Sequence, residues 1–294
     1  MECELIRPPV LGEALAARQQ YGADCLPIAG GQSLLVMLRN KLVSPKALID
    51  LEPLEELRGI EQKSDGISIG AMTTFYTLLS SPEIKESAPL LAQAAALVSS
   101  TAIRNLGTIG GNVCHNELGA DLPPALLTLN GFAELKSRNG DRRLPLGDFF
   151  RGYFETALQP EELLCRIEIA KLPRGAAGVY LKHAITSEDL AIVGVAAIVV
   201  PDGVGKGSVA EVRIGLSGVA PVPLRAVQAE AALKGAVLDA KSAREAGEIA
   251  ATEADPESDP HATADYRRKM VKVFVRRALL AALEQTGRNG HGKG

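Results

Sequence analysis

The sequence contains no tryptophan, and aromatic residues make up only 4% of its 294 residues. Proteins that bind single-stranded nucleic acid stack the bases on interleaved aromatic side chains. The formal net charge is −3, so the chain also lacks the strongly basic surface on which most nucleic-acid binders depend. Both shortages argue against a nucleic-acid partner.

Cysteine is also scarce, with only Cys3, Cys25, Cys114 and Cys165, all far apart. No CxxC pair is present, so neither an internal iron–sulfur cluster nor a zinc ribbon is expected. The adjacent Cys114 and His115 supply only two ligands, and we expect a buried structural cysteine rather than a metal site. Cysteine usage of this kind is typical of a reduced, cytoplasmic location.

Long apolar runs are missing as well. No stretch of 18 apolar residues occurs, which predicts that the chain does not span a membrane. The first residues, Met1–Glu4, are acidic and lack the layout of a signal peptide. A length of 294 residues favours about two domains with ordinary hydrophobic cores.

Glycine, in contrast, is abundant: it makes up 29 of the 294 residues, whereas an average protein contains about 7% glycine. The first cluster is the sequence AGGQSL at 29–34, which follows an expected strand and precedes an expected helix. Gly30 and Gly31 can adopt positive φ, and Ser33 can cap the helix, leaving N–H groups free for an anion. The alternative is an ordinary strand-to-helix turn. No GK[ST] follows, so this is not a P-loop.

The second cluster is TIGGN at 108–112, within a stretch at 101–112 that lacks periodicity. By itself it could be a tight turn between two helices. Two separate Gly-Gly turns, however, favour one extended anionic ligand, such as a pyrophosphate, held between them. We refer to residues 29–34 as the first glycine motif and to residues 108–112 as the second.

Periodicity and turn signals predict an α+β protein. Asp65-Gly66 and Asn139-Gly140 are hairpin signals. The predicted helices cover 11–21, 33–40, 73–80, 89–99, 122–129, 224–234, 242–253 and 265–285. The predicted strands cover 25–29, 47–51, 57–60, 67–71, 132–137, 143–145, 163–170, 178–184, 191–200 and 208–218. Near residue 174 the pattern of predicted elements changes to long strands followed by helices. We therefore expect domains at 1–174 (subdomains about 1–55 and 56–174) and 175–286, with a disordered tail at 287–294.

Four segments appear in a specific order: AGGQSL, RNLGTIGGN, ADLPPALLTL and GDFFRGYFETALQPEELL. Together they resemble the FAD-binding medium subunit of the molybdenum hydroxylases, the group of carbon monoxide dehydrogenase and xanthine dehydrogenase. The resemblance covers residues 1 to 286. It implies a two-part N-terminal FAD-binding domain of the PCMH-type α/β fold. A C-terminal three-stranded antiparallel sheet with a helical bundle would follow.

The resemblance also implies site residues. The loop around the FAD pyrophosphate would comprise Pro27, Ile28, Ala29, Gly30, Gly31, Gln32, Ser33 and Leu34. The opposite side would comprise Thr108, Ile109, Gly110, Gly111 and Asn112. Asp121 would bind flavin hydroxyls, and Leu164 and Lys182 would line the flavin. From the residues alone, Asp121 could instead cap the next helix, and Lys182 could be a solvated strand lysine. Val98 stands where some relatives place an aromatic over the flavin ring.

The resemblance implies a subunit of a larger oxidoreductase. A large subunit would carry the molybdenum cofactor and a small subunit two iron–sulfur clusters, as a dimer of heterotrimers. This chain would pass electrons from those clusters through FAD to NAD⁺, O₂ or a quinone. Because the flavin supplies the chemistry, no catalytic side chain and no metal are expected in this chain. The alternatives are a free-standing FAD oxidase or reductase, and a non-enzymatic nucleotide-binding module.

The charges of the last third are segregated by sign. Acidic residues dominate 245–259 and basic residues dominate 267–277. We expect two solvated helix surfaces of opposite sign rather than a partner-binding site.

Overall fold

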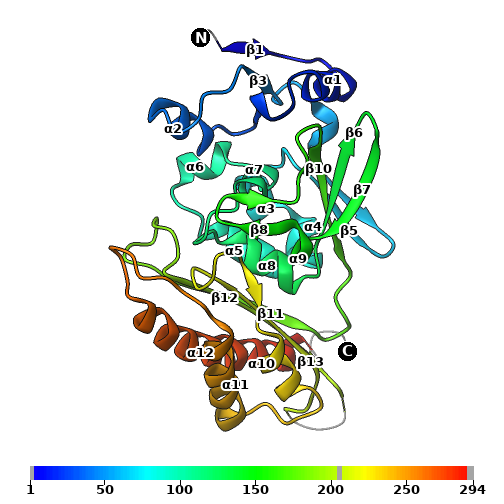
Figure 1. The fold of residues 1–294 in the computed structure, drawn as a ribbon. Helices are drawn as coiled ribbons and strands as arrows, with labels where there is room; N and C mark the ends of the chain where they lie inside the picture. Colours follow the sequence, from blue (N-terminus) through cyan, green and yellow to red (C-terminus); the bar gives the residue numbers. More distant parts are fainter. Residues whose placement is uncertain (1–2, 204–206, 290–294) are drawn as a thin grey trace.

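The computed structural model describes residues 3–203 and 207–289. Three parts follow one another from top to bottom in Figure 1: a small parallel sheet, a middle part with an antiparallel sheet and short helices, and a C-terminal sheet covered by long helices. Both the mixed α+β class and the order of the parts confirm the sequence-based prediction.

The N-terminal part alternates strands and helices: β1 (Glu4–Ile6), α1 (Leu11–Tyr21), β2 (Cys25–Ile28), α2 (Leu34–Arg39) and β3 (Ala47–Asp50). The three strands are parallel, in the order β1-β3-β2. Arg18 of α1 is buried, and its guanidinium donates to the carbonyl oxygens of Cys25 and, at 3.3 Å, Glu162. This arginine joins the small sheet to the middle part.

The middle part contains a five-stranded antiparallel sheet in the order β4-β5-β10-β6-β7. Its strands are β4 (Ile60–Lys63), β5 (Gly66–Gly70), β6 (Phe132–Ser137), β7 (Gly140–Pro145) and β10 (Leu163–Ala170). Its helices are α3 (Phe75–Ser80), α4 (Pro82–Ser87), α5 (Pro89–Ala96), α6 (Thr101–Leu106), α7 (Ile109–His115), α8 (Leu122–Thr128) and α9 (Leu146–Phe149). A small hairpin, β8 (Phe150–Gly152) and β9 (Glu155–Thr156), precedes β10.

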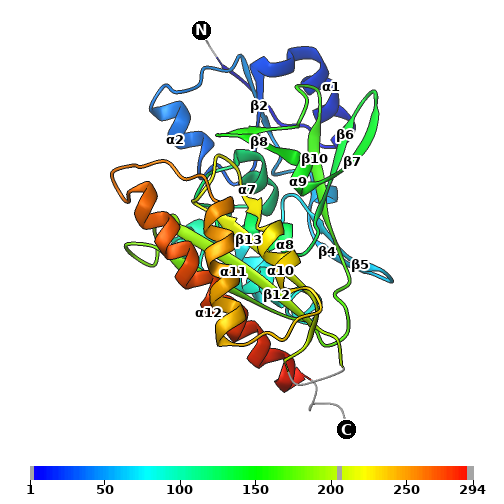
Figure 2. The ribbon, with the colours of Figure 1, turned by 60° about the horizontal axis from the view of Figure 1, so that its bottom comes forward.

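The C-terminal sheet has the order β11-β12-β13-β14, with β11 (Ala177–His183), β12 (Val193–Pro201), β13 (Val209–Ser217) and β14 (Leu224–Arg225). The helices α10 (Val227–Leu233), α11 (Ala240–Glu253) and α12 (Ala264–Asn289) cover one face (Figure 2). Alternate residues of β12 explain its apolar sequence. Val195 and Ala197 pack beneath these helices, whereas Ala196 and Ile198 pack against the middle part.

Helix α8 of the middle part packs against the C-terminal sheet. A Cβ on Gly215 of β13 would overlap the carbonyl oxygen of Pro124, so this strand runs directly over the helix backbone. At the end of α8, Arg213 donates to Thr128 O at 3.3 Å, and Arg225 donates to Leu127 O at 3.2 Å. The last carbonyls of a helix lack intrahelical partners, and here arginines from the C-terminal sheet satisfy two of them.

The structure corrects the sequence-based elements in four places. Residues 101–112, expected to lack regular structure, begin two short helices that the hydroxyls of Ser100 and Thr108 cap. The strand expected from residue 57 starts at Ile60, after a 3₁₀ turn at Glu55–Leu57.

The other two corrections concern the C-terminal part. The sheet expected to have three strands has a fourth, because Leu224–Arg225 pairs with β13 before α10 begins. Helix α12 continues to Asn289, three residues into the tail expected to be disordered; residues 290–294 lie outside the described part of the chain. The division of the chain near residue 174 stays a prediction.

Candidate functional site

The first glycine motif is an open loop between β2 and α2. Gly31 has a φ of +71°, which glycine adopts without strain. Gln32 Nε2 donates to Gly30 O at 2.8 Å, and Leu35 N donates to Gly31 O at 3.1 Å. The expected cap by Ser33 is wrong, because its side chain makes no capping hydrogen bond.

The backbone N–H groups of this loop are its main chemical feature. Within residues 3–203 and 207–289, the N–H groups of Gly30, Gly31, Gln32 and Ser33 have no hydrogen-bond acceptor. All four residues are partly buried. Unpaired, partly shielded N–H groups in a glycine loop favour an anionic ligand.

The second glycine motif is the start of α7, and its N–H groups are already paired. Ile109 N donates to Thr73 O at 3.0 Å, and Gly110 N donates to Ala71 O at 2.9 Å. Gly111 N donates to the Thr108 hydroxyl oxygen at 3.1 Å. The N–H groups of residues 109–111 are therefore not available to the extended anion that the two Gly-Gly turns favoured.

Close packing accounts for the glycines of the second motif. A Cβ on Gly110 would lie 2.6 Å from Ala71 Cβ and 2.7 Å from Ala71 O. Gly111 lies within α7 and does not have positive φ, so its backbone alone does not require glycine. Its missing Cβ would lie 2.9 Å from the Thr108 hydroxyl, which caps the helix.

The structure brings the two motifs together. A Cβ on Gly30 would overlap the carbonyl oxygen of Leu106, and one on Gly111 would lie 3.8 Å from Ala29 Cβ. Figure 1 shows α2 beside α6 and α7. Asn112 follows in the same helix, and its Oδ1 is buried without a hydrogen-bond partner among the described residues. A buried oxygen of the second motif without a partner in the described residues is suited to a ligand donor.

Asp121 and Lys182 form a buried pair at a second junction, between α8 and β11. Lys182 Nζ lies 3.0 Å from Asp121 Oδ2, and the two side chains are 5% and 4% exposed. Lys182 also donates to Leu97 O at 2.9 Å, and Tyr180 donates its hydroxyl to Asp121 Oδ1 at 2.8 Å. Both simpler interpretations are wrong: Asp121 makes no cap bond, and Lys182 is not solvated.

Burial dominates the electrostatics of this pair. Desolvation raises the pKa of Asp121 to about 6, although Lys182 and the Tyr180 hydroxyl both act to lower it. Burial also raises the pKa of Tyr180 well above its usual range, so this hydroxyl keeps its proton and remains a donor. Asp121 is thus an acceptor that titrates just below neutral pH.

Leu164 and Cys114 lie in surroundings that give them no reactive role. Leu164 is buried on β10, in the core that also contains Ile109 and Val98. Cys114 is a free, partly buried cysteine, and burial raises its pKa to about 12, which makes it a poor nucleophile. No group of three or more His, Cys, Asp or Glu side chains that could hold a metal occurs within residues 3–203 and 207–289.

Sequence reasoning missed Tyr180 and Arg104. Tyr180 lies two residues before Lys182 in a strand, so both side chains lie on one face, and period-two reasoning could have found it. Arg104 donates to the carbonyl oxygens of Val98, at 2.8 Å, and Ser99. It holds the loop that also supplies Leu97 O to Lys182, and no local sequence signal indicates this.

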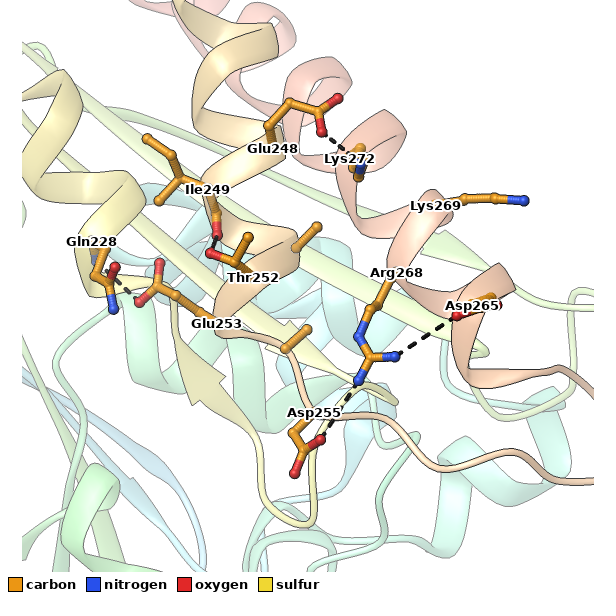
Figure 3. A pocket seen from close by; sticks show the side chains of 12 residues that line it. Gln228, Glu248, Ile249, Thr252, Glu253, Asp255, Asp265, Arg268, Lys269 and Lys272 are labelled. Carbon is orange, nitrogen blue, oxygen red and sulfur yellow. Dashed lines mark hydrogen bonds and ion pairs between the residues drawn. The ribbon is translucent and has the colours of Figure 1, made fainter.

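An open groove of about 890 Å³ lies elsewhere, over α11 and α12 (Figure 3). It contains ion pairs: Lys272 lies 2.5 Å from Glu248, and Arg268 lies 3.6 Å from Asp255. The two helices expected to present separate charged surfaces therefore pair across their contact. The neighbouring Arg267 is buried and donates to Ile192 O at 2.6 Å. This open, charge-paired groove is not the site that the glycine motifs form.

Comparison with known proteins identifies the family. The model described as the FAD binding domain in molybdopterin dehydrogenase matches residues 1–172, and the CO dehydrogenase flavoprotein C-terminal domain matches residues 179–282. The chain belongs to the FAD-binding medium subunits of the molybdenum hydroxylases. It is therefore a flavoprotein subunit of an oxidoreductase.

Other medium subunits match along nearly their full length. The carbon monoxide dehydrogenase medium chain of Hydrogenophaga pseudoflava is 35% identical, with 94% of this chain and 95% of that one covered. The glyceraldehyde dehydrogenase medium chain of Sulfolobus acidocaldarius is 32% identical, with 95% and 97% covered. A solved carbon monoxide dehydrogenase from Hydrogenophaga pseudoflava superposes with a TM-score of 0.93 at 36% identity, covering 97% of this medium subunit and 98% of that chain. Among the described residues, no helix is long and apolar enough to cross a membrane.

Proposed function

We propose that this chain receives electrons from the iron–sulfur clusters of a small subunit and delivers them to a final acceptor. Its FAD would supply the redox chemistry when bound, and the protein would bind and orient that cofactor. The observation that carries this proposal is the row of four N–H groups at residues 30–33 that find no acceptor in the described part of the chain, which suits a pyrophosphate.

The donors and acceptors of the two junctions fit the parts of FAD. Residues 27–34 would surround the pyrophosphate, with charge-assisted hydrogen bonds from the free N–H groups. Residues 108–112 would close the other side through the Thr108 hydroxyl and Asn112 Oδ1, rather than through paired N–H groups. Asp121 would accept hydrogen bonds from cofactor hydroxyls, and Leu164 and Lys182 would bound the remaining sides.

The partners we propose are a large subunit with the molybdenum cofactor and a small subunit with two iron–sulfur clusters. We propose a dimer of such heterotrimers in the cytoplasm. The large subunit would select the substrate, since the medium chains named above belong to enzymes for carbon monoxide and for glyceraldehyde. This chain's fold alone therefore does not determine the substrate.

Reconstitution of electron transfer tests the proposal. The chain should purify yellow, and heat or acid should release all of its FAD, because no covalent attachment is expected. Hydroxylase substrates should not reduce the FAD of the chain alone, and reduction should require both partner subunits. Substrate-dependent bleaching of the lone chain would instead indicate a free-standing oxidase. A chain without flavin after gentle preparation would indicate a non-enzymatic nucleotide-binding module.

A further inference from the structure

Hydrogen bonds from outside its own sheet hold both the backbone and the side-chain hydroxyl of Tyr180. Its backbone N donates to Gln93 Oε1 at 3.1 Å, and Gln93 Nε2 donates back to Gly178 O at 3.2 Å. Its hydroxyl donates to Asp121 Oδ1 at 2.8 Å. Helix α5 therefore holds the backbone of Tyr180, while the side chain reaches α8.

The Tyr180 side chain is tightly enclosed by its neighbours. Tyr180 is 3% exposed. A Cβ on Gly194 of the neighbouring β12 would lie 2.6 Å from the Tyr180 hydroxyl oxygen, so only glycine there admits the tyrosine as it stands. The hydroxyl donates to the carboxylate of Asp121, and the Ser217 hydroxyl lies beside it at Gly194.

We propose that Tyr180 is a positioning residue that orients the Asp121 carboxylate toward the hydroxyls of FAD and keeps it ionised. This inference rests on the proposed role of Asp121 in binding FAD. Lys182 occupies Oδ2 and Tyr180 occupies Oδ1, so both oxygens have fixed directions, and their remaining lone pairs can accept from a ligand. Lys182 and Tyr180, both from β11, are the charged or titratable groups that act on Asp121 among the described residues.

The sign of the pH dependence follows from the acceptor role. A ligand hydroxyl binds the ionised carboxylate more strongly than the protonated form, so FAD affinity should fall as pH drops below about 6. The Tyr180 hydroxyl stabilises the ionised form, and its removal raises the pKa of Asp121. In Tyr180→Phe the loss of FAD affinity should therefore begin at higher pH.

The test measures FAD dissociation constants of the full chain from pH 5 to pH 8 by equilibrium dialysis, with apo-protein thermal midpoints alongside. We expect Tyr180→Phe to weaken binding about 3- to 10-fold at pH 7 and to move the pH profile upward. In Gly194→Ala the added Cβ would lie 2.4 Å from Ser217 Oγ and 2.6 Å from the Tyr180 hydroxyl, so this variant crowds both hydroxyls and should shift the profile in the same direction. Tyr21→Phe is the matched control, because that hydroxyl also donates to a carboxylate, Glu4, at 2.6 Å but far from Asp121.

Three outcomes would overturn the inference in distinguishable ways. An unchanged affinity and profile in Tyr180→Phe, with Asp121→Asn impaired, would refute the positioning role alone. A pH-independent loss in Tyr180→Phe that follows a lower thermal midpoint would show a merely structural tyrosine. Full FAD affinity in Asp121→Asn would refute the proposed role of Asp121, and the positioning role with it.

Discussion

The two glycine motifs share a Gly-Gly pair but differ in what their backbones do. At residues 30–33 the N–H groups have no acceptor among the described residues, and Gly31 has positive φ. At residues 109–111 each N–H already donates within the protein, and Gly110 is pressed against Ala71. Among the described residues, the first motif leaves its N–H groups without acceptors, and the second uses its N–H groups to join neighbouring segments. A repeated sequence signature therefore does not imply a repeated role.

The largest effect should come from Gly31→Val. A β-branched side chain disfavours positive φ, so the loop must change conformation and its N–H groups turn away from the anion. FAD affinity should fall at least about 100-fold, since each of two or more lost charge-assisted hydrogen bonds contributes about 1.5–3 kcal/mol. Bound FAD per chain and the dissociation constant measure this loss.

Gly110→Val is the matched control for that change. Its side chain would meet the Ala71 backbone, and overpacking costs about 1–3 kcal/mol of folding stability. The apo-protein thermal midpoint should fall more in Gly110→Val than in Gly31→Val, whose added Cβ meets only the flexible Leu35 and Ile28 side chains. If Gly31→Val kept full FAD occupancy, the first motif would be a turn and the contrast between the motifs would collapse.

A second prediction concerns Asp121, which, unlike the open first motif, is a buried acceptor. Its pKa of about 6 lies above the unfolded value of 3.8, so the folded state holds its proton more tightly. This group therefore lowers stability as pH rises from about 4 to about 6, by roughly 3 kcal/mol. The stability of the wild type minus that of Asp121→Asn should decrease across this window, as measured by denaturant unfolding of the apo-protein.

The result shows whether burial or the pair with Lys182 dominates the pKa of Asp121. A difference that stays constant with pH would mean that Asp121 has an ordinary pKa and that the Lys182 pair balances the effect of burial. A decreasing difference, together with weaker FAD binding in Asp121→Asn, would show a carboxylate that costs stability at neutral pH and serves the ligand.

Regular elements were predictable because their patterns are local. The helix at 11–21 and the strand at 163–170 have the predicted bounds, since period 3.6 and period 2 are visible in the residues. The short helices at 101–106 and 109–115 were not, because a single capping hydroxyl starts each one and neither is long enough to show a period.

The glycine motifs and Asp121 can be found in the sequence, but their hydrogen bonds cannot. The glycines are visible in the sequence, whereas the carbonyls of Ala71 and Thr73 that pair the second motif come from a distant segment. Likewise, Asp121 precedes a helix, which favours a cap locally, and only the fold brings Lys182 to it. Bonds between remote segments follow from tertiary structure, which one sequence does not display.

A third prediction tests the packing role of the second motif at its cap. Thr108→Val keeps the shape of the side chain and removes the oxygen that accepts from Gly111 N. The apo-protein should lose about 1 kcal/mol, the usual contribution of an N-cap. Thr74→Val is the control, because the Thr74 hydroxyl caps α3, accepting from Thr77 N at 3.2 Å, and it also bonds the Thr77 hydroxyl at 2.9 Å.

The two cap variants should differ in FAD binding. Both should lower the thermal midpoint by similar amounts, but only Thr108→Val removes a hydroxyl at the junction of the motifs, so only it should weaken FAD binding, by about 3- to 10-fold. Equal FAD affinity in both variants would show that the second motif contributes packing and no ligand contact.

The smallest effect should come from Lys272→Ala in the large groove of the C-terminal domain. Lys272 is half-exposed and pairs with the exposed Glu248, and exposed ion pairs contribute about 0–1 kcal/mol. FAD affinity should not change, because the residue lies on α12, on the face of the C-terminal sheet opposite the middle part. The difference in stability from wild type should shrink further in 1 M salt, where the Debye length is about 3 Å. A loss of FAD comparable to that of Gly31→Val would mean that the large groove, not the open glycine loop, holds the cofactor.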